Sequence, residues 1–230
     1  MPQTSEVSRF SRASRGRLTV HDLGRFPSDT LFDRLARAVC AAGCPPRKEL
    51  YEAWEMARRV RRLFRGGRIV DLGAGHGLLA QTLLLLDDSS PGALVVDPVL
   101  ARSSANVHEA LVRAWPRLSG RVVFRAAALD AVEIGKGDLV VSSHACGALT
   151  DRVLERAVEA RARVAVLPCC HDRGASDAGD LTGWLDAASA IDAVRALRLR
   201  AQGYRIWTHT IPPAITAKNR LLLGAPCDER

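Results

Sequence analysis

Two short stretches of the chain combine thiol and imidazole side chains at the ends of apolar runs. "SSHACGALTD" covers residues 142–151, and "LPCCH" covers residues 167–171. His144 and Cys146 are two residues apart, so in an extended chain their side chains share a face. There His144 can act as a general base toward a hydroxyl or amine nucleophile, which makes the two residues candidates for catalysis. A histidine buried against the next helix and bonded to backbone is the structural alternative.

The same stretches raise the question of a metal or a disulfide. Their thiols and imidazoles belong to His144, Cys146, Cys169, Cys170 and His171. No C-x-x-C pair is present, and consecutive strand residues face opposite ways, so we expect no metal. A bond between Cys169 and Cys170 is disfavoured, because neighbouring Cα atoms lie about 3.8 Å apart. With no secretory signal, we expect reduced thiols in a cytoplasmic protein, one of the pair facing a reaction site and the other packing inward.

A third stretch, "IVDLGAGHGLLA" at residues 69–80, has the spacing of a cofactor loop. Glycines at positions 73, 75 and 77 lie between a strand that contains Asp71 and an apolar helix. Glycines permit a tight turn and let a ligand approach bare backbone at a helix N-terminus. Asp97 ends the next strand, where its carboxylate can accept both hydroxyls of a ribose. The dinucleotide pattern G-x-G-x-x-G is not met at Leu78, which makes an NAD-dependent oxidoreductase a weaker alternative.

The elements that would position these residues form an alternating pattern. From residue 68 onward, short apolar runs alternate with helical periodicity, which predicts β-α units around a parallel sheet. We predict strands at 68–73, 93–97, 121–126, 137–143 and 163–168, and helices at 77–87, 101–115, 149–160 and 180–198. "YRIWTHTI" and "NRLLLGAP" are predicted to close the sheet as a hairpin. Because open α/β sheets bind ligands at the carboxyl ends of their strands, both thiol-containing stretches should border the reaction site.

The region before this domain is basic. Residues 1–68 hold 15 Lys and Arg against 7 Asp and Glu, whereas residues 69–230 hold 18 of each, so the first third carries the net charge of +8. We predict a mobile basic arm over 1–26, a helical segment over 27–67 and the main domain over 68–230. Arginines suit phosphate contacts, which makes an acidic polymer such as RNA a natural partner.

Two further features qualify that expectation. Arg58, Arg61, Arg62 and Arg65 lie three or four residues apart, as either a phosphate-binding ridge or a solvent-facing side of a helix. The longest uncharged apolar run, residues 77–86, is too short to cross a bilayer, so we expect no membrane partner. Nothing in the pattern predicts the oligomeric state.

The motifs also resemble a known family. The glycine loop resembles motif I of class I S-adenosylmethionine-dependent methyltransferases. "HACG-x-x-TD", "PCCH" and "TAKNRLL" resemble the methyltransferase domain shared by tRNA 2′-O-ribose methyltransferases of the acceptor stem and glutathione-S-transferase C-terminal-domain-containing methyltransferase-like proteins. The resemblance covers residues 45–225. It implies a Rossmann-like class I fold, with a mostly parallel seven-strand sheet, a C-terminal antiparallel hairpin and preceding N-terminal helices.

The resemblance also implies S-adenosylmethionine as cofactor. Residues 73–77 would make room for its methionine part through Gly73, Ala74, Gly75 and Gly77. Asp71 would orient its ammonium group and Asp97 its ribose. Asp130, after the third strand, is either a contact for the adenine amino group or a simple turn residue.

The substrate would lie beside the two thiol-containing stretches. The residues expected there are Cys169, Cys170, His171, Lys218, Asn219 and Arg220. The last three could hold a phosphate or the acceptor group, whereas Asn219 and Arg220 could instead fix the loop. We expect a methyltransferase that acts on RNA, with tRNA ribose favoured. The alternatives are a protein or small-molecule substrate, and a non-catalytic module that binds the cofactor and RNA.

Overall fold

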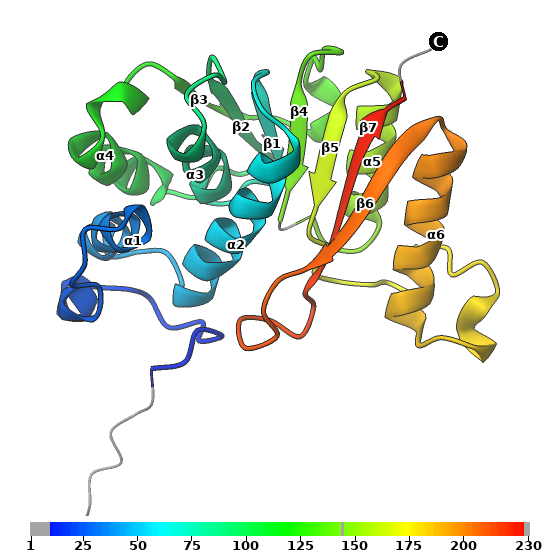
Figure 1. Ribbon diagram of the computed structural model, residues 1–230, viewed down its shortest axis with the longest axis horizontal. Helices are drawn as coiled ribbons and strands as arrows, with labels where there is room; N and C mark the ends of the chain where they lie inside the picture. Colours follow the sequence, from blue (N-terminus) through cyan, green and yellow to red (C-terminus); the bar gives the residue numbers. More distant parts are fainter. Residues whose placement is uncertain (1–9, 144, 228–230) are drawn as a thin grey trace, which may run out of the picture.

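The computed structural model describes residues 10–143 and 145–227 and contains one seven-stranded sheet (Figure 1). The strand order is β3-β2-β1-β4-β5-β7-β6. Strands β1 to β5 are parallel, and β7 runs antiparallel to both of its neighbours. The bounds are β1 Ile69–Leu72, β2 Ala93–Asp97, β3 Val122–Ala126, β4 Leu139–Ser142, β5 Arg163–Val166, β6 Tyr204–Thr210 and β7 Arg220–Pro226. This topology confirms the predicted fold class.

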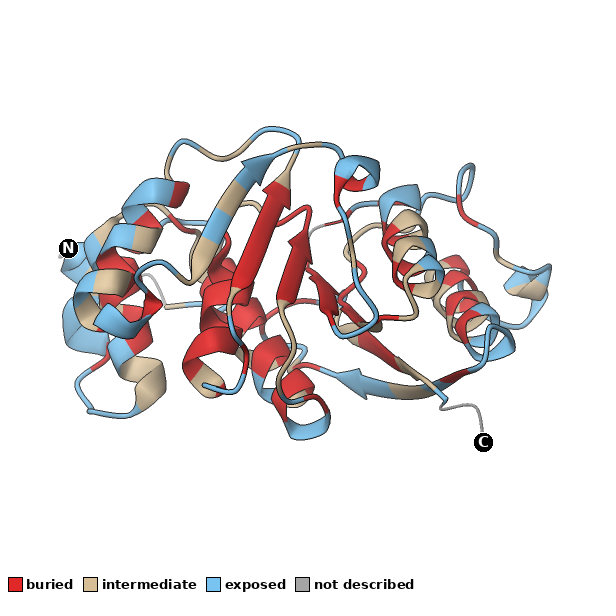
Figure 2. Ribbon diagram, turned by 90° about the horizontal axis from the view of Figure 1, so that it is seen from above, coloured by how far each residue is buried: buried red, intermediate tan, exposed pale blue. Residues whose placement is uncertain are grey.

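Helices cover both faces of the sheet. Their bounds are α1 Leu31–Ala42, α2 Arg47–Leu63, α3 Leu78–Leu86, α4 Ser104–Ala114, α5 Ala148–Glu159 and α6 Ala187–Ala201. One apolar core joins α1 to α4 to one face of the sheet, and a second joins α5 to the other face. The central strands are buried along most of their length (Figure 2). Within the described residues, no helix is both long and apolar enough to cross a membrane.

The predicted strands and helices match the observed ones within a few residues, with two differences near the site. Strand β5 ends at Val166, two residues before the predicted end, since Pro168 has no N–H for the ladder. Helix α6 begins at Ala187 instead of 180, because the Asp186 side chain accepts the Ser189 amide and caps the helix there. Cys169 and Cys170 therefore lie in a loop.

The N-terminal segment over residues 10–26 is packed, unlike the mobile arm that its polar composition predicts. Leu18 is fully buried, and its amide donates to the Pro45 carbonyl at 3.0 Å. Phe26 is also buried and contacts the Phe10 ring edge to face. Residues 1–9 of the predicted arm lie outside the described part. Few apolar residues are enough here, because Leu18 and Phe26 enter the core and Phe10 packs against it.

The four arginines on and just after α2 do not form one surface. The Arg61 side chain is 3% exposed, donates to the Ser90 hydroxyl at 2.8 Å and pairs with Asp87 at 3.2 Å. Arg62 and Arg65 are exposed. Neither sequence-based alternative holds for Arg61, because its charge is used inside the protein to join α2 to the loop after α3.

Candidate functional site

The glycine loop connects β1 to α3 in a conformation that requires glycine. Gly73, Gly75 and Gly77 have φ values of +66°, +54° and +70°, in the left-handed region. A Cβ atom on Gly77 would lie 3.0 Å from both Val95 and Phe124, whereas a Cβ on Gly75 would meet nothing within 4 Å. Gly77 therefore allows the loop to pack on the sheet, and Gly75 borders open space.

The end of β2 holds this loop in place. The amides of Gly73 and Ala74 donate to the Val96 carbonyl at 2.9 and 3.1 Å. The Gly75 amide donates to Asp97 Oδ2 at 3.2 Å, and Val99 donates to Oδ1 at 3.1 Å. Each carboxylate oxygen has a further lone pair, so the half-buried Asp97 can still accept the two hydroxyls of a ribose.

Asp71 is a buried carboxyl with one unused oxygen. Its Oδ2 accepts the Ala80 amide at 3.2 Å, while its buried Oδ1 has no hydrogen-bond partner among the described residues. Burial, together with the nearby charges of Glu49 and Asp97, raises the pKa of Asp71 to about 8, against the lowering effect of the Ala80 amide. An orphaned acceptor in a buried position fits a cationic donor such as the ammonium of S-adenosylmethionine.

Two residues that the sequence analysis missed join the loop to α2. His76 Nδ1 lies 2.8 Å from a carboxylate oxygen of Glu49, which is buried in the first turn of α2. The hydrogen bond to Glu49 raises the pKa of His76, against the opposing effect of burial. No spacing rule connects residues 27 positions apart in different elements, so only the fold reveals this pair.

Asp130 lies in a 3-10 turn, Leu129–Ala131, after β3. Its side chain is 63% exposed, and its Oδ1 accepts from Arg152 Nε at 2.7 Å. This ion pair with α5 fits the turn-residue alternative. Contact with the adenine amino group stays a prediction.

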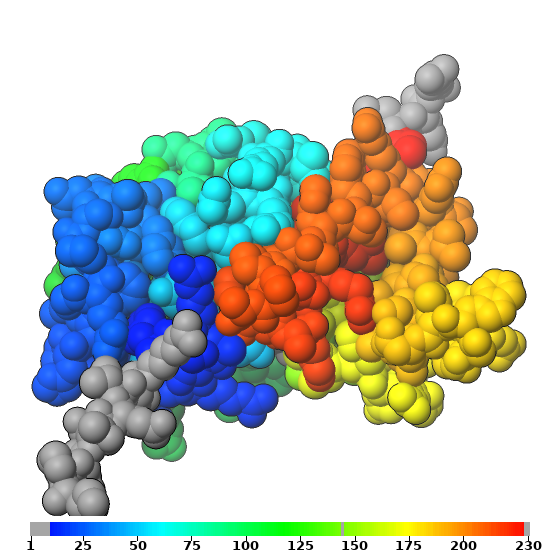
Figure 3. Space-filling view, turned by 60° about the horizontal axis from the view of Figure 1, so that its bottom comes forward, coloured from blue at the N-terminus to red at the C-terminus, as the bar shows by residue number. Residues whose placement is uncertain are grey.

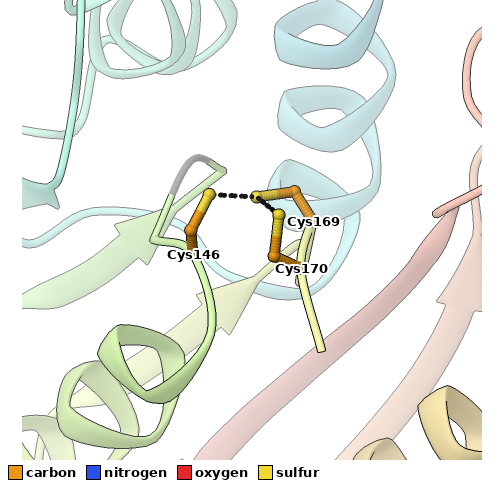
Figure 4. Close-up of side chains that lie close together, drawn as sticks. All are labelled: Cys146, Cys169 and Cys170. Atoms are coloured by element: carbon orange, nitrogen blue, oxygen red, sulfur yellow. Dashed lines mark hydrogen bonds between the residues drawn. The ribbon is translucent and has the colours of Figure 1, made fainter. Parts of the chain in front are cut away.

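Three cysteines converge at the carboxyl ends of β4 and β5 (Figure 4). Cys146 Sγ lies 3.0 Å from Cys169 Sγ, which lies 3.9 Å from Cys170 Sγ. The expectation that Cys169 and Cys170 point in opposite directions is wrong, because strand alternation ends with β5 at Val166. His144, the predicted general base, lies outside the described residues.

The cysteines line a cavity of about 580 Å³, which we call the edge cavity. Its other walls come from the N-terminal segment, the start of α2 and the loop between β6 and β7. They comprise Ala13, Arg15, Pro46, Lys48, Glu49, Glu52 and residues 215–218. Figure 3 shows the N-terminal segment beside the loop from β6 to β7 on this face. Because Glu49 also holds His76, the edge cavity adjoins the glycine loop.

The remaining predicted substrate residues divide into two groups. Lys218 lines the edge cavity, and its Nζ lies 3.8 Å from Cys170 Sγ. His171 Nε2 and Arg220 Nε instead contact the two oxygens of Asp192, at 2.8 and 2.7 Å. Asn219 Nδ2 donates to the Ile211 carbonyl at 2.9 Å and closes the loop between β6 and β7. The contacts of these three residues are therefore internal, and for Asn219 and Arg220 this fits the alternative in which they fix the loop.

Several solved structures that share this fold are methyltransferases. An O-methyltransferase family protein from Burkholderia thailandensis has a TM-score of 0.52 at 18% identity, covering 92% of this chain and 64% of that one. The B. subtilis M1A22 tRNA methyltransferase TrmK has a TM-score of 0.50 at 15% identity, covering 76% and 66%. M. capricolum TrmK, in complex with S-adenosyl-homocysteine, has a TM-score of 0.50 at 14% identity, covering 75% and 68%. The fold is that of class I methyltransferases.

Sequence comparison adds the family. Residues 48–175, more than half of the chain, match the family model of a methyltransferase domain, and the chain belongs to this family of S-adenosylmethionine-dependent enzymes. A glutathione S-transferase C-terminal domain-containing protein homolog from Drosophila pseudoobscura pseudoobscura is 27% identical over 199 residues, covering 69% of this chain. The chain spans 33% of the length of that relative. The predicted resemblance to this group is confirmed.

Proposed function

We propose that this protein transfers a methyl group from S-adenosylmethionine to RNA, with a tRNA ribose favoured. The observation that carries the proposal is the basic wall of the edge cavity. Arg12, Arg15 and Arg17 are exposed on the packed N-terminal segment, and Arg15 and Lys218 line the cavity itself. Exposed arginines beside a ligand-sized cavity suit the phosphates of a nucleic acid better than a neutral metabolite.

The residues of the glycine loop would hold the cofactor. Asp97 would accept the ribose hydroxyls, the glycine backbone would leave room for the methionine part, and Asp71 would face the ammonium group. When bound, S-adenosylmethionine supplies an activated methyl group on a sulfonium. The protein then has to orient the acceptor in line with that methyl group and remove a proton from it.

The direct test is transfer of labelled methyl groups to separate pools. The full chain is incubated with labelled S-adenosylmethionine and with RNA, protein and small metabolites in turn. We expect label in the RNA pool, and nuclease digestion of labelled tRNA should yield a 2′-O-methylated nucleoside. Label in protein or in metabolites alone would show that the substrate belongs to that pool and would contradict RNA as the substrate. Cofactor binding with label in no pool would favour a non-catalytic binding module.

A matched pair of arginine variants tests the basic wall. Arg15→Ala removes a charge from the edge cavity, whereas Arg200→Ala removes an exposed charge from α6. Loss of a phosphate contact should raise KM for RNA and flatten its dependence on salt, with little change in kcat. Arg200→Ala should behave like the unaltered protein. Equal KM values for the two variants would argue against RNA binding at this wall.

The general base is tested separately. His144→Ala should lower kcat by about 10²- to 10⁴-fold if His144 removes the acceptor proton, while binding of S-adenosylhomocysteine stays unchanged. Full activity of the variant would remove His144 from the proposed chemistry and leave the assignment of RNA as substrate intact.

A further inference from the structure

We propose that Cys146, Cys169 and Cys170 bind one Zn²⁺ ion through three thiolates. Their ligand atoms all lie within 4.8 Å of one another, at the place where the loops after β4 and β5 meet. Zinc is borderline soft, takes thiolate ligands and imposes no geometric preference of its own. The proposal concerns metal binding and does not depend on the identity of the methyl acceptor.

The sulfur spacing fits a zinc centre. Tetrahedral coordination with Zn–S bonds near 2.3 Å places two sulfurs about 3.8 Å apart. Cys169 and Cys170 are already at 3.9 Å, and Cys146 would have to move away from Cys169 by less than about 1 Å. The absence of a C-x-x-C pair, which argued against a metal from sequence, matters less here, because the third ligand comes from another loop and Cys169 and Cys170 are not in a strand.

The backbone that carries the thiols is fixed without them. The Gly147 amide donates to the Cys170 carbonyl at 3.2 Å and joins the two loops. The Gly147 carbonyl in turn accepts from Arg195 at 3.1 Å, and Arg195 is nearly fully buried and paired with Asp151 at 2.7 Å. A ligand set on a preorganised backbone loses little conformational freedom when it binds a metal.

Charge and access are also consistent with an ion at this place. Three thiolates around Zn²⁺ leave one negative charge, which the Lys218 ammonium, 3.8 Å from Cys170 Sγ, can balance. His171 is bonded to Asp192, and so it is held away from a role as fourth ligand. All three cysteines line the edge cavity, so the fourth coordination position faces it and is open to water or to a donor atom of a bound substrate.

The main competing chemistry is a disulfide between Cys146 and Cys169. It would need the sulfurs to close from 3.0 Å to about 2.05 Å and would leave Cys170 and Lys218 without a part in the site. We favour zinc because it uses all three sulfurs and the nearby cation. Under this proposal, the predicted roles of the cysteines in catalysis and substrate contact become roles as metal ligands.

The experiment measures zinc in the full-length chain after dialysis against metal-free buffer containing a thiol-free reductant. Elemental analysis should find one zinc per chain in the unaltered protein and none in Cys146→Ser, Cys169→Ser or Cys170→Ser. Cys44→Ser and Cys227→Ser are matched controls, since these thiols lie outside the cluster, and both should retain one zinc. Zinc loss in the controls equal to that in the cluster variants would contradict the site.

A second measurement remains informative if a variant fails to fold. The unaltered protein is stripped with a chelator and titrated with Co²⁺, which should give sulfur-to-metal charge-transfer absorption that added Zn²⁺ abolishes. Zinc should also raise the unfolding temperature of the stripped protein. A disulfide would lower the intact mass by two hydrogens when no reductant is present. That mass, together with no charge-transfer band and no retained zinc after reduction, would overturn the proposal in favour of the disulfide.

Discussion

At the residue scale, Asp71 in β1, just before the glycine loop, is a carboxyl that is costly to bury. The side chain is 1% exposed, and one of its oxygens has no hydrogen-bond partner among the described residues. Desolvation disfavours the charged form, and the pKa rises to about 8. A cationic group bound beside Asp71 would restore the charge, and under the proposed function the ammonium of the cofactor would offset this cost of burial.

Replacement of Asp71 by Asn should change how stability depends on pH. Between the unfolded pKa of about 3.9 and the folded pKa of about 8, the folded protein holds a proton that the unfolded chain releases. The free energy of unfolding therefore falls as pH rises through this window. Asp71→Asn has no carboxyl to titrate and does not lose stability in this way. As pH rises through the window, its free energy of unfolding relative to that of the unaltered protein should therefore rise by an amount on the order of a few kcal/mol.

Urea unfolding without cofactor at pH 5, 6.5 and 8 measures this difference. The gap between the two proteins should widen toward pH 8 and level off above it. A gap independent of pH would show that Asp71 is ionised in the folded protein and that its burial has no effect on titration.

At the element scale, the loop from β1 to α3 separates two roles that glycines serve. Gly77 lies against Val95 and Phe124 of the neighbouring strands, whereas Gly75 faces open space. Both have positive φ, so a side chain at either position strains the backbone. Only at Gly77 would the side chain also collide with the sheet.

The matched variants Gly77→Ala and Gly75→Ala separate these roles. Gly77→Ala should destabilise the protein by about 2–4 kcal/mol, from backbone strain together with overpacking. Gly75→Ala should cost about 1–2 kcal/mol and chiefly weaken cofactor binding, since its methyl group enters the ligand space. Thermal unfolding and S-adenosylhomocysteine titration measure the two effects. Equal destabilisation by both variants would contradict the division.

At the scale of the whole molecule, the N-terminal segment completes the site. It meets the start of α2 through the bridge between Arg17 and Pro46, and it contributes Ala13 and Arg15 to the edge cavity. The first third of the chain therefore supplies both the positive charge and a wall of the cavity. A substrate that enters the edge cavity would meet this segment and the loop between β6 and β7 together.

Leu18→Ala tests whether this segment is anchored. Removal of a fully buried leucine side chain should lower the free energy of unfolding by about 2–5 kcal/mol. Val20→Ala, two residues away and 56% exposed, should stay within about 0.5 kcal/mol of the unaltered protein. Urea denaturation of the two variants gives the comparison. An unchanged free energy of unfolding in Leu18→Ala would contradict the anchoring of this segment and would favour the mobile arm predicted from composition.

Features that depend on local sequence patterns could be predicted, whereas features that depend on contacts between distant elements could not. Alternating apolar runs and the spacing of glycines after the first strand are local, and they predicted the sheet, its closing hairpin and the glycine loop. Pairs such as His76 with Glu49 depend on how α2 packs, which no periodicity encodes. The sequence predicted that the two thiol-containing stretches meet, but not that Cys169 and Cys170 both reach Cys146, because the end of β5 at Val166 frees the following residues from strand alternation.

The central claim is that the glycine loop with Asp97 binds S-adenosylmethionine, and calorimetric titration with S-adenosylhomocysteine tests it most directly. We predict saturable binding to the unaltered chain, no binding of NAD, and affinity at least about tenfold weaker in Asp97→Ala, which loses hydrogen bonds to the ribose. The unfolding temperature of the variant checks that it is folded. Binding of NAD in place of S-adenosylhomocysteine, or unchanged affinity in folded Asp97→Ala, would contradict the account.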